Sequence, residues 1–200
     1  MKPQLVLGSR NNKKLGELKA LLGDLPLELF DLSPYPEAPE VEETGATFEE
    51  NAKLKATALA PALNAWVLGE DSGLCVPKLG GAPGIYSARY AGTHGDNAAN
   101  NAKLLDEMND LHGEDRAAYF VSAVALANPQ GEVVAMAEAR CHGVIARELR
   151  GHGGFGYDPL FVIREYHASF GELSETVKHA LSHRGRAIAK LRPKIREFVL

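Results

Sequence analysis

Cysteine is scarce in this chain, and long apolar runs are missing from it. The two cysteines, Cys75 and Cys141, are too few for a disulfide framework and too far apart for a zinc site. No apolar run approaches the ~18–20 residues that span a bilayer, and the N-terminal residues contain no signal-peptide core. We therefore expect a cytoplasmic protein with buried thiols and no membrane partner.

An excess of charge of one sign is also absent. The chain has 22 Lys and Arg against 26 Asp and Glu, a formal net charge of −4, and the two signs are interspersed. We therefore expect no broad basic surface for a nucleic-acid backbone. The apolar share of 45% is typical of folded domains. A length of 200 residues suits one domain, residues 1–200, with two lobes around a shared core.

Hydrophobic periodicity predicts strands that alternate with helices. Leucines at helical spacing predict a helix that ends at Gly23, and Thr47 with Glu50 forms a capping box for a second helix. Further helices are expected after Asp96, after Ser174 and near the C-terminus. Strands are expected over 4–7, 27–32, 66–68, 117–127, 132–139 and 160–163. Helices mixed with both crossover and hairpin strands indicate an α/β fold on a mixed sheet.

A polar loop joins the first predicted strand to the first predicted helix. A helix that starts there presents outward-pointing N–H groups and the positive end of its dipole, which suits phosphate. The residues that would contact phosphate are Ser9, Arg10, Asn11, Asn12, Lys13 and Lys14. A plain capped turn with solvated lysines explains the same residues equally well. The loop lacks the Gly-x-x-x-x-Gly-Lys-Ser/Thr pattern of a Walker loop.

Acidic side chains in two later segments could hold a divalent cation. Glu42, with Glu43 as its alternative, lies in a loop before the second helix. Asp71 lies where the third predicted strand ends, the position at which α/β sheets present ligand-binding residues. Magnesium takes oxygen ligands, usually one or two carboxylates with phosphates and waters. A solvated loop explains Glu42 more simply, and a turn capped through Ser72 explains Asp71 equally well.

The second predicted helix carries another candidate phosphate ligand. Asn51 and Lys55 lie four residues apart and therefore face the same side of that helix, whereas Lys53 lies off this line. If the helix flanks a metal, Lys55 reaches a phosphate. The alternative is an ordinary surface lysine.

A glycine-rich loop near the C-terminus combines backbone freedom with aromatic side chains. The run from Gly151 to Gly156 matches Gly-x-Gly-x-x-Gly in letters, but Tyr157-Asp158-Pro159 and a strand follow it where a helix is required. We therefore reject a dinucleotide-binding fingerprint. We expect a loop that lets the backbone and the Phe155 ring approach a planar base.

Three donors follow this loop. Lys178, His183 and Arg184 offer hydrogens that the 6-oxo group of a purine would accept. Adenine would present its own amino donor to them, and such unpaired polar groups discriminate by ~10⁴ or more. A basic helix end, where cations suit the dipole, is the simpler alternative for any one of the three.

These motifs together resemble the inosine/xanthosine triphosphate pyrophosphatase family, nearly from end to end. The matching segments are residues 9–14 with Glu17, 42–45, 47–52, 71–74, 80–90, 153–159, 172–173 and 182–185. No single segment is decisive, but the ordered set is highly specific. Position 70 departs from the pattern, because this chain has Glu where many relatives have Asp.

The resemblance implies a fold, an activity and a role for each matching residue. It implies an elongated mixed sheet flanked by helices, two lobes with a cleft between them, and a homodimer. It also implies Mg²⁺-dependent hydrolysis of noncanonical purine nucleoside triphosphates (ITP, dITP and XTP) to the monophosphate and pyrophosphate, which cleanses the nucleotide pool. Residues 9–14 would hold the triphosphate, Glu42 and Asp71 would hold the metal, and Asp71 would also accept a proton from water. Substrate contacts would come from Ser72, Phe155, Gly156, Tyr157, Asp158, Lys178, His183 and Arg184.

Two other functions stay open at this point. One is a pyrophosphatase for modified pyrimidine or other damaged nucleotides. The other is a nucleotide-binding module without catalysis, although the presence of both acids and the lysines favours an enzyme.

Overall fold

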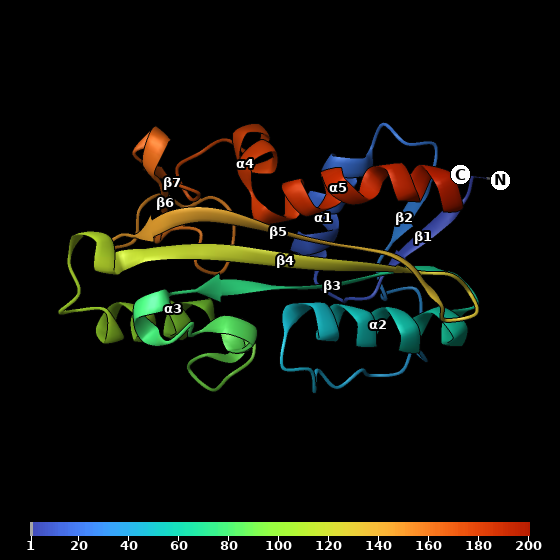
Figure 1. Cartoon of the computed structure of the whole chain (residues 1–200), viewed down its shortest axis with the longest axis horizontal. Coiled ribbons are helices and arrows are strands. Elements are labelled where there is room, and N and C mark those ends of the chain that lie inside the picture. The colour runs from blue at the N-terminus through green and yellow to red at the C-terminus, as the bar shows by residue number, and fades with distance from the viewer. Residues whose placement is uncertain (1) are drawn as a thin grey trace. The chain divides into compact units, whose positions relative to one another are not determined.

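A mixed sheet of seven strands runs through the computed structural model, which describes residues 2–200. The strand order is β2-β1-β3-β4-β5-β6-β7 (Figure 1). The strands are β1 Gln4–Leu7, β2 Glu28–Phe30, β3 Trp66–Cys75, β4 Ala117–Ala127, β5 Val133–Ile145, β6 Phe161–Ile163 and β7 Ala168–Ser169. β1 pairs in parallel with β2 and β3, whereas β6 pairs antiparallel with β5 and β7. The predicted α/β fold on a mixed sheet is confirmed.

Five α-helices in the described residues connect or follow the strands. They are α1 Asn12–Leu22, α2 Phe48–Leu63, α3 Asn97–Glu107, α4 Glu175–Leu181 and α5 His183–Phe198. The predicted caps are confirmed, because the side chains of Thr47, Asp96 and Ser174 each accept a hydrogen bond from the first turn of their helix. No helix within residues 2–200 is long and apolar enough to cross a membrane.

The chain divides into two compact units. The first unit comprises the residues up to Asp71, Ser122–Ala139 and Arg184–Leu200. In this unit α1 and α5 cover one face of the sheet and α2 covers the other (Figure 1). The core under α1 and α5 contains buried residues of both helices and of four strands, among them Leu7, Leu18, Leu68, Val124 and Leu191. The N- and C-terminal helices thus share one apolar layer, whose burial is the main stabilising contribution.

The second unit comprises Ser72–Val121 and Arg140–His183. Its core gathers residues of α3, of the strands and of the loop before β6. Three phenylalanine rings form its centre, since Phe120 lies 4.6 Å from Phe161 and 6.3 Å from Phe170 between ring centroids. Tilted and offset rings at these separations add to the stabilisation that comes from area burial alone.

β3 is longer than the sequence predicts. The acidic pair and the glycines after Leu68 argue for a turn, yet the strand continues to Cys75. Asp71 therefore lies inside a ten-residue strand, and its prediction at a strand end was wrong. β5 also runs on to Ile145, β2 is shorter than expected, and the two-residue β7 was not predicted. α2 continues past Pro61 to Leu63, because proline in the last turn removes few backbone hydrogen bonds.

Gly69 explains how α2 approaches β3 so closely. A Cβ at this position would lie 2.1 Å from the carbonyl oxygen of Ala52 and 2.7 Å from the backbone nitrogen of Ala56. Both atoms belong to the α2 backbone, so no side-chain rotation relieves the contact. The helix that carries Asn51 and Lys55 is held against the strand that carries Asp71 because position 69 has no side chain.

We expect Gly69→Ala to lower the free energy of unfolding by about 1–3 kcal/mol or more, because α2 must move away from the strand. Urea unfolding followed by circular dichroism measures this loss. Gly16→Ala is the matched control, since a Cβ there meets nothing within 4 Å on the exposed side of α1. The control should gain up to roughly 1 kcal/mol in helix propensity. Equal stabilities of the two variants would contradict the close-packing argument.

Candidate active site

Two consecutive acids on β3, Glu70 and Asp71, form the centre of the site. The last paired position between β1 and β3 is Leu7 with Leu68, and the Gly8 N–H donates to the Leu68 carbonyl at 3.0 Å. Beyond that point β1 gives way to the polar loop, while β3 continues with both acids. The acids lie inside β3, next to the carboxyl end of its parallel neighbour β1, and α/β sheets bind ligands at such an edge. Because side chains alternate along a strand, they point to opposite faces.

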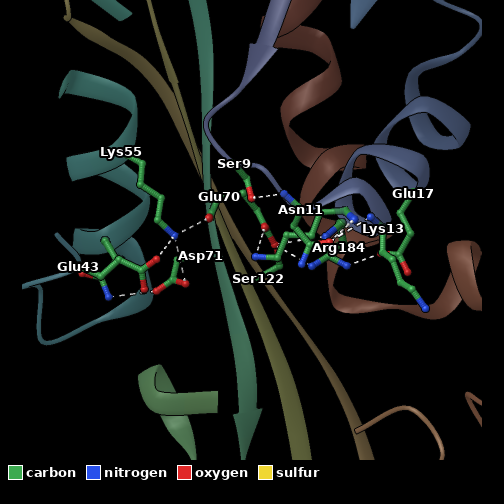
Figure 2. Close-up of polar contacts among 12 residues, drawn as sticks. Ser9, Asn11, Lys13, Glu17, Glu43, Lys55, Glu70, Asp71, Ser122 and Arg184 are labelled. Carbon is green, nitrogen blue, oxygen red and sulfur yellow. Dashed lines mark hydrogen bonds and ion pairs between the residues drawn. The ribbon is translucent and has the colours of Figure 1, made fainter. Parts of the chain in front are cut away.

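Glu70 points to the face that α1 and α5 cover (Figure 2). Lys14 Nζ lies 2.7 Å from its Oε2, and Arg184 donates from Nε and Nη2 to its Oε1 at 3.2 and 2.9 Å. The Ser122 hydroxyl also donates to Oε1, at 3.2 Å. Arg184 Nη1 in turn donates to Glu17 on α1. Two acids and two cations therefore form one charge-balanced cluster.

This cluster keeps its charges although it is buried. Glu70 is 1% exposed and Arg184 is 2% exposed. Burial acts to raise the pKa of Glu70, but Arg184 and Lys14 outweigh it and hold that pKa well below its usual range. Burial lowers the pKa of Arg184, and Glu70 with Glu17 more than compensates. Arg184 was predicted to read a base, and its guanidinium here contacts two carboxylates. Its role as a base reader stays a prediction.

Asp71 points to the opposite face, toward α2 (Figure 2). Asn51 Nδ2 donates to Asp71 Oδ2 at 3.1 Å, and Lys55 Nζ lies 3.6 Å from Asp71 Oδ1. The Lys55 ammonium also lies 2.6 Å from Glu43 Oε1 and donates to the Glu70 carbonyl at 3.1 Å. The expectation that Asn51 and Lys55 share one face of α2 is confirmed.

Burial shapes the proton affinity of Asp71. Burial raises the pKa of Asp71, the Lys55 ammonium opposes this effect, and Glu43 adds to it, so that the net shift is upward. Lys55 keeps its charge, because Asp71 and Glu43 raise its pKa by more than burial lowers it. A carboxylate with a raised pKa is better suited to accept a proton than an ordinary aspartate.

Of the two glutamates in the loop before α2, Glu43 is the one beside Asp71. Glu43 is half-buried and pairs with Lys55, whereas Glu42 is exposed. Asn51 Oδ1 accepts the Gly45 N–H at 2.8 Å, so one amide holds both this loop and Asp71. Glu43 is therefore better placed than Glu42 to share a cation with Asp71.

The donor chemistry around Lys55 fits the expected magnesium ion. Two carboxylates and a backbone carbonyl are hard oxygen ligands of the kind that Mg²⁺ takes, with phosphate and water oxygens in the remaining positions. No group of three or more His, Cys, Asp or Glu side chains that could hold a metal occurs among residues 2–200.

The predicted phosphate loop folds as a capped turn. Asn11 is the N-cap of α1, and its Oδ1 accepts the N–H groups of Lys13 and Lys14 at 3.0 and 3.1 Å. Ser9 Oγ accepts the Asn11 N–H at 3.1 Å. The alternative of a capped turn is thus confirmed, except that Lys14 pairs with Glu70. Arg10, Asn12 and Lys13 are exposed, and phosphate binding at this loop stays a prediction.

The second unit holds most of the predicted base-reading residues. Asp158 Oδ2 accepts both the Phe155 N–H and the Lys178 ammonium, each at 2.7 Å. Lys178 Nζ also lies 5.0 Å from the centre of the half-buried Phe155 ring. The ring and the cation are therefore positioned by one buried carboxylate.

Three more contacts fix the surroundings of that loop. The Tyr157 hydroxyl donates to the Ser87 carbonyl at 2.9 Å, and Asn101 Nδ2 donates to the Gly156 carbonyl at 3.0 Å. The His183 ring is buried and stacks on Phe120 at 4.7 Å. Ser72 is half-buried on β3 in the same unit.

Sequence reasoning missed three residues that organise the site. Glu70, Asn51 and Asn101 were not singled out for these roles. The signal for Glu70 was an acid inside a strand-length apolar segment, which requires a buried partner. The signal for Asn51 was its position one turn before Lys55. Nothing in the sequence separates Asn101 from its neighbours Asn97 and Asn100.

Comparisons with known proteins show which family this chain resembles over nearly its whole length. The sequence profile of the Ham1 family matches residues 5–194. A protein of Rhodopirellula baltica named dITP/XTP pyrophosphatase is 52% identical over 195 residues, which cover 98% of this chain and 94% of that protein. A Geobacter sulfurreducens protein of the same name is 48% identical over 189 residues, 94% of each chain.

Solved structures show the same fold. A HAM1 protein from Coxiella burnetii superposes with a TM-score of 0.87 at 36% identity, over 98% of this chain and 99% of that one. A Mycobacterium abscessus structure, described as a nucleoside-triphosphatase and dITP/XTP pyrophosphatase, gives a TM-score of 0.75 at 47% identity, over 96% of this chain and 99% of that one. These matches extend over nearly the whole length and confirm the resemblance read from the motifs. The chain belongs to the Ham1 family.

Proposed function

We propose that this chain hydrolyses noncanonical purine nucleoside triphosphates, dITP, ITP and XTP, to the monophosphate and pyrophosphate. Relatives at 46–52% identity are named dITP/XTP pyrophosphatase. The observation that carries the proposal is a set of ion pairs in the first unit. Asp71 and Glu43 both pair with the Lys55 ammonium, and Lys14 pairs with Glu70. Carboxylates for a metal and lysines for phosphate are thus assembled around one strand.

The lysines and the start of α1 bind the triphosphate. Lys13, Lys14 and Lys55 supply positive charge, and the dipole of α1 adds to it at the capped turn. As the α–β phosphoanhydride bond breaks, negative charge accumulates on the departing pyrophosphate. Fixed cations stabilise that charge without reorganisation during the reaction. Lys14 is held by Glu70 in advance, so its ammonium is already oriented.

Asp71 is the proton acceptor for the attacking water. Its buried carboxylate has a raised pKa and is oriented by the Asn51 amide. Glu43 and Asp71 would hold the magnesium ion, which would neutralise phosphate charge and orient water.

The second unit recognises the base. The Phe155 ring stacks on the purine, while Lys178 and His183 donate to its 6-oxo group. Guanine also carries a 6-oxo group, so its rejection depends on position 2, where xanthine has oxygen, hypoxanthine has hydrogen and guanine has an amine. A donor near position 2 would pair with the xanthine oxygen and meet only a hydrogen in hypoxanthine, whereas in guanine it would face the amine, another donor.

Asp71→Asn should lose turnover by about 10²–10⁴-fold, because the amide cannot accept the proton. The change keeps the size of the side chain, and an amide oxygen can still accept from Asn51, so we expect folding to persist. Pyrophosphate release from dITP at saturating Mg²⁺ measures the loss, and thermal unfolding checks the fold.

Asp96→Asn is the matched control for this variant. Asp96 caps α3 through Oδ1, and asparagine is an equally good N-cap. The control should keep full activity. Full activity of Asp71→Asn would remove Asp71 from the proposed role.

A nucleotide panel tests the proposed base selectivity. We expect dITP, ITP and XTP to release pyrophosphate rapidly, and dATP to react roughly 10⁴-fold more slowly, because donors would face the adenine amine. dGTP should also be rejected, and EDTA should abolish all turnover. Equal rates for all purines would exclude base selectivity, and preference for dUTP or methylated nucleotides would indicate a different damaged substrate. Binding of ITP without any pyrophosphate release would indicate a non-catalytic module.

We also propose that the protein is a cytoplasmic homodimer, as the family resemblance implies. Exposed apolar side chains in the second unit, including Tyr86, Leu149 and Tyr166, offer surface that association would bury. Sedimentation equilibrium at micromolar concentration should give twice the chain mass of 21.5 kDa. A concentration-independent mass of one chain would contradict the dimer.

A further inference from the structure

The Lys55 ammonium lies at the centre of the oxygen atoms that fit a metal ion (Figure 2). Its Nζ lies 2.6 Å from Glu43 Oε1 and 3.6 Å from Asp71 Oδ1, and it donates to the Glu70 carbonyl at 3.1 Å. Lys55 is 9% exposed. The ammonium thus lies within hydrogen-bond distance of two of these oxygens and forms a longer ion pair with the third, Asp71 Oδ1. The site for a divalent ion and the binding place of this ammonium thus share the same oxygens.

The Asn51 amide, and not Lys55 alone, holds these oxygen atoms in place. Asn51 accepts the Gly45 N–H and donates to Asp71 Oδ2, and therefore fixes the acidic loop and the strand at once. Asn51 is 1% exposed, so its amide has little freedom to turn. The two carboxylates consequently stay close together, and buried like charges require a cation between them.

We propose that Lys55 is the resident cation of the Glu43–Asp71 pair, and that it keeps free divalent metal out of the nucleotide-free enzyme. A divalent ion and the ammonium cannot bind these oxygens at the same time, because the two cations would lie too close to each other. When nucleotide binds together with its metal, the ion takes the carboxylates and the flexible lysine stem turns its ammonium to a phosphate. Metal then enters with the nucleotide and not before it.

The direction of this exchange follows from the charges. Lys55, Glu43 and Asp71 together carry one net negative charge, so a free divalent ion gains little while the ammonium stays. A triphosphate gives the ammonium an alternative anionic partner and brings further oxygens to the ion. Glu43 is 27% exposed at its side chain, which leaves the carboxylate pair open to an entering ion.

Binding of Mn²⁺ alone, without nucleotide, tests the proposal. Mn²⁺ prefers the same oxygen ligands, and its electron paramagnetic resonance signal reports free and bound ion. Lys55→Met and Lys55→Gln should bind Mn²⁺ at least about 10-fold more tightly than the unaltered protein, a gain of roughly 1.4 kcal/mol per tenfold. Lys53→Met is the matched control on the exposed side of α2 and should leave the affinity unchanged.

A second set of variants assigns the gain to the carboxylate pair. Adding Asp71→Asn to Lys55→Met should remove the gain, because one of the two acidic ligands is lost. Mn²⁺ should also raise the thermal midpoint of Lys55→Met by more than that of the unaltered protein, because the ion replaces the missing charge. Unchanged or weaker Mn²⁺ affinity in both Lys55 variants would overturn the proposal. So would variants that stay unfolded at saturating Mn²⁺.

The second half of the proposal, transfer of Lys55 to phosphate, rests on the proposed function. The Mn²⁺ measurement uses no nucleotide, so its outcome is independent of turnover. A chain that hydrolyses none of the panel could still show the gain in Mn²⁺ affinity. If the enzyme is active but its Lys55 variants gain no Mn²⁺ affinity, the resident-cation role of Lys55 is excluded and the proposed function is unaffected.

Discussion

Two adjacent acids in the interior of β3 are the constraint on which the site depends. Strand alternation sends Glu70 to one face of the sheet and Asp71 to the other, and neither carboxylate can stay buried without a cation or donor. Each face therefore has to bring its own partners: Lys14 and Arg184 from α1 and α5 to Glu70, and Asn51 and Lys55 from α2 to Asp71. Lys14 and Lys55 are therefore positioned by the two buried carboxylates of β3, and they lie on opposite faces of the sheet.

The Glu70 cluster also joins segments from the two ends of the chain. Arg184 on α5 contacts Glu17 on α1, and Arg192 donates to the Leu21 carbonyl on the same helix. Breaking a buried ion pair by removing one partner typically costs 3–5 kcal/mol, because the remaining charge loses its compensation. The apolar layer between α1 and α5 stabilises their contact, whereas the charged pairs fix how the helices are aligned. This alignment helps to set where the Lys14 ammonium lies, because Lys14 and Arg184 contact the same carboxylate, Glu70.

Much of the fold could be predicted from the sequence, because its signals are local. Caps at Thr47, Asp96 and Ser174 and the leucine spacing of α1 depend only on neighbouring residues, and all were confirmed. The length of β3 could not be predicted, because glycine at position 69 indicates a strand break in the sequence. Its reason is the α2 backbone that packs against it, which only the structure shows. The same holds for the position of Glu43, and not Glu42, beside Asp71, which depends on the hydrogen bond that the Gly45 N–H donates to Asn51 Oδ1. The motif resemblance identified the family, whereas the pairings of the matching residues depend on which face of the sheet each one reaches.

The second unit also contains a buried carboxylate, Asp158, that is paired with a cation and a donor. Asp158 is 3% exposed and accepts both the Phe155 N–H and the Lys178 ammonium at one oxygen. An aromatic ring alone would stack on any base, and a lysine alone would attract any oxygen. Under the proposed function, a ring and a cation held by one carboxylate would together set the plane of a bound base and the edge that approaches the lysine. Asp158, predicted as a direct reader of the base, contacts the Phe155 N–H and the Lys178 ammonium, and its role in reading a base stays a prediction.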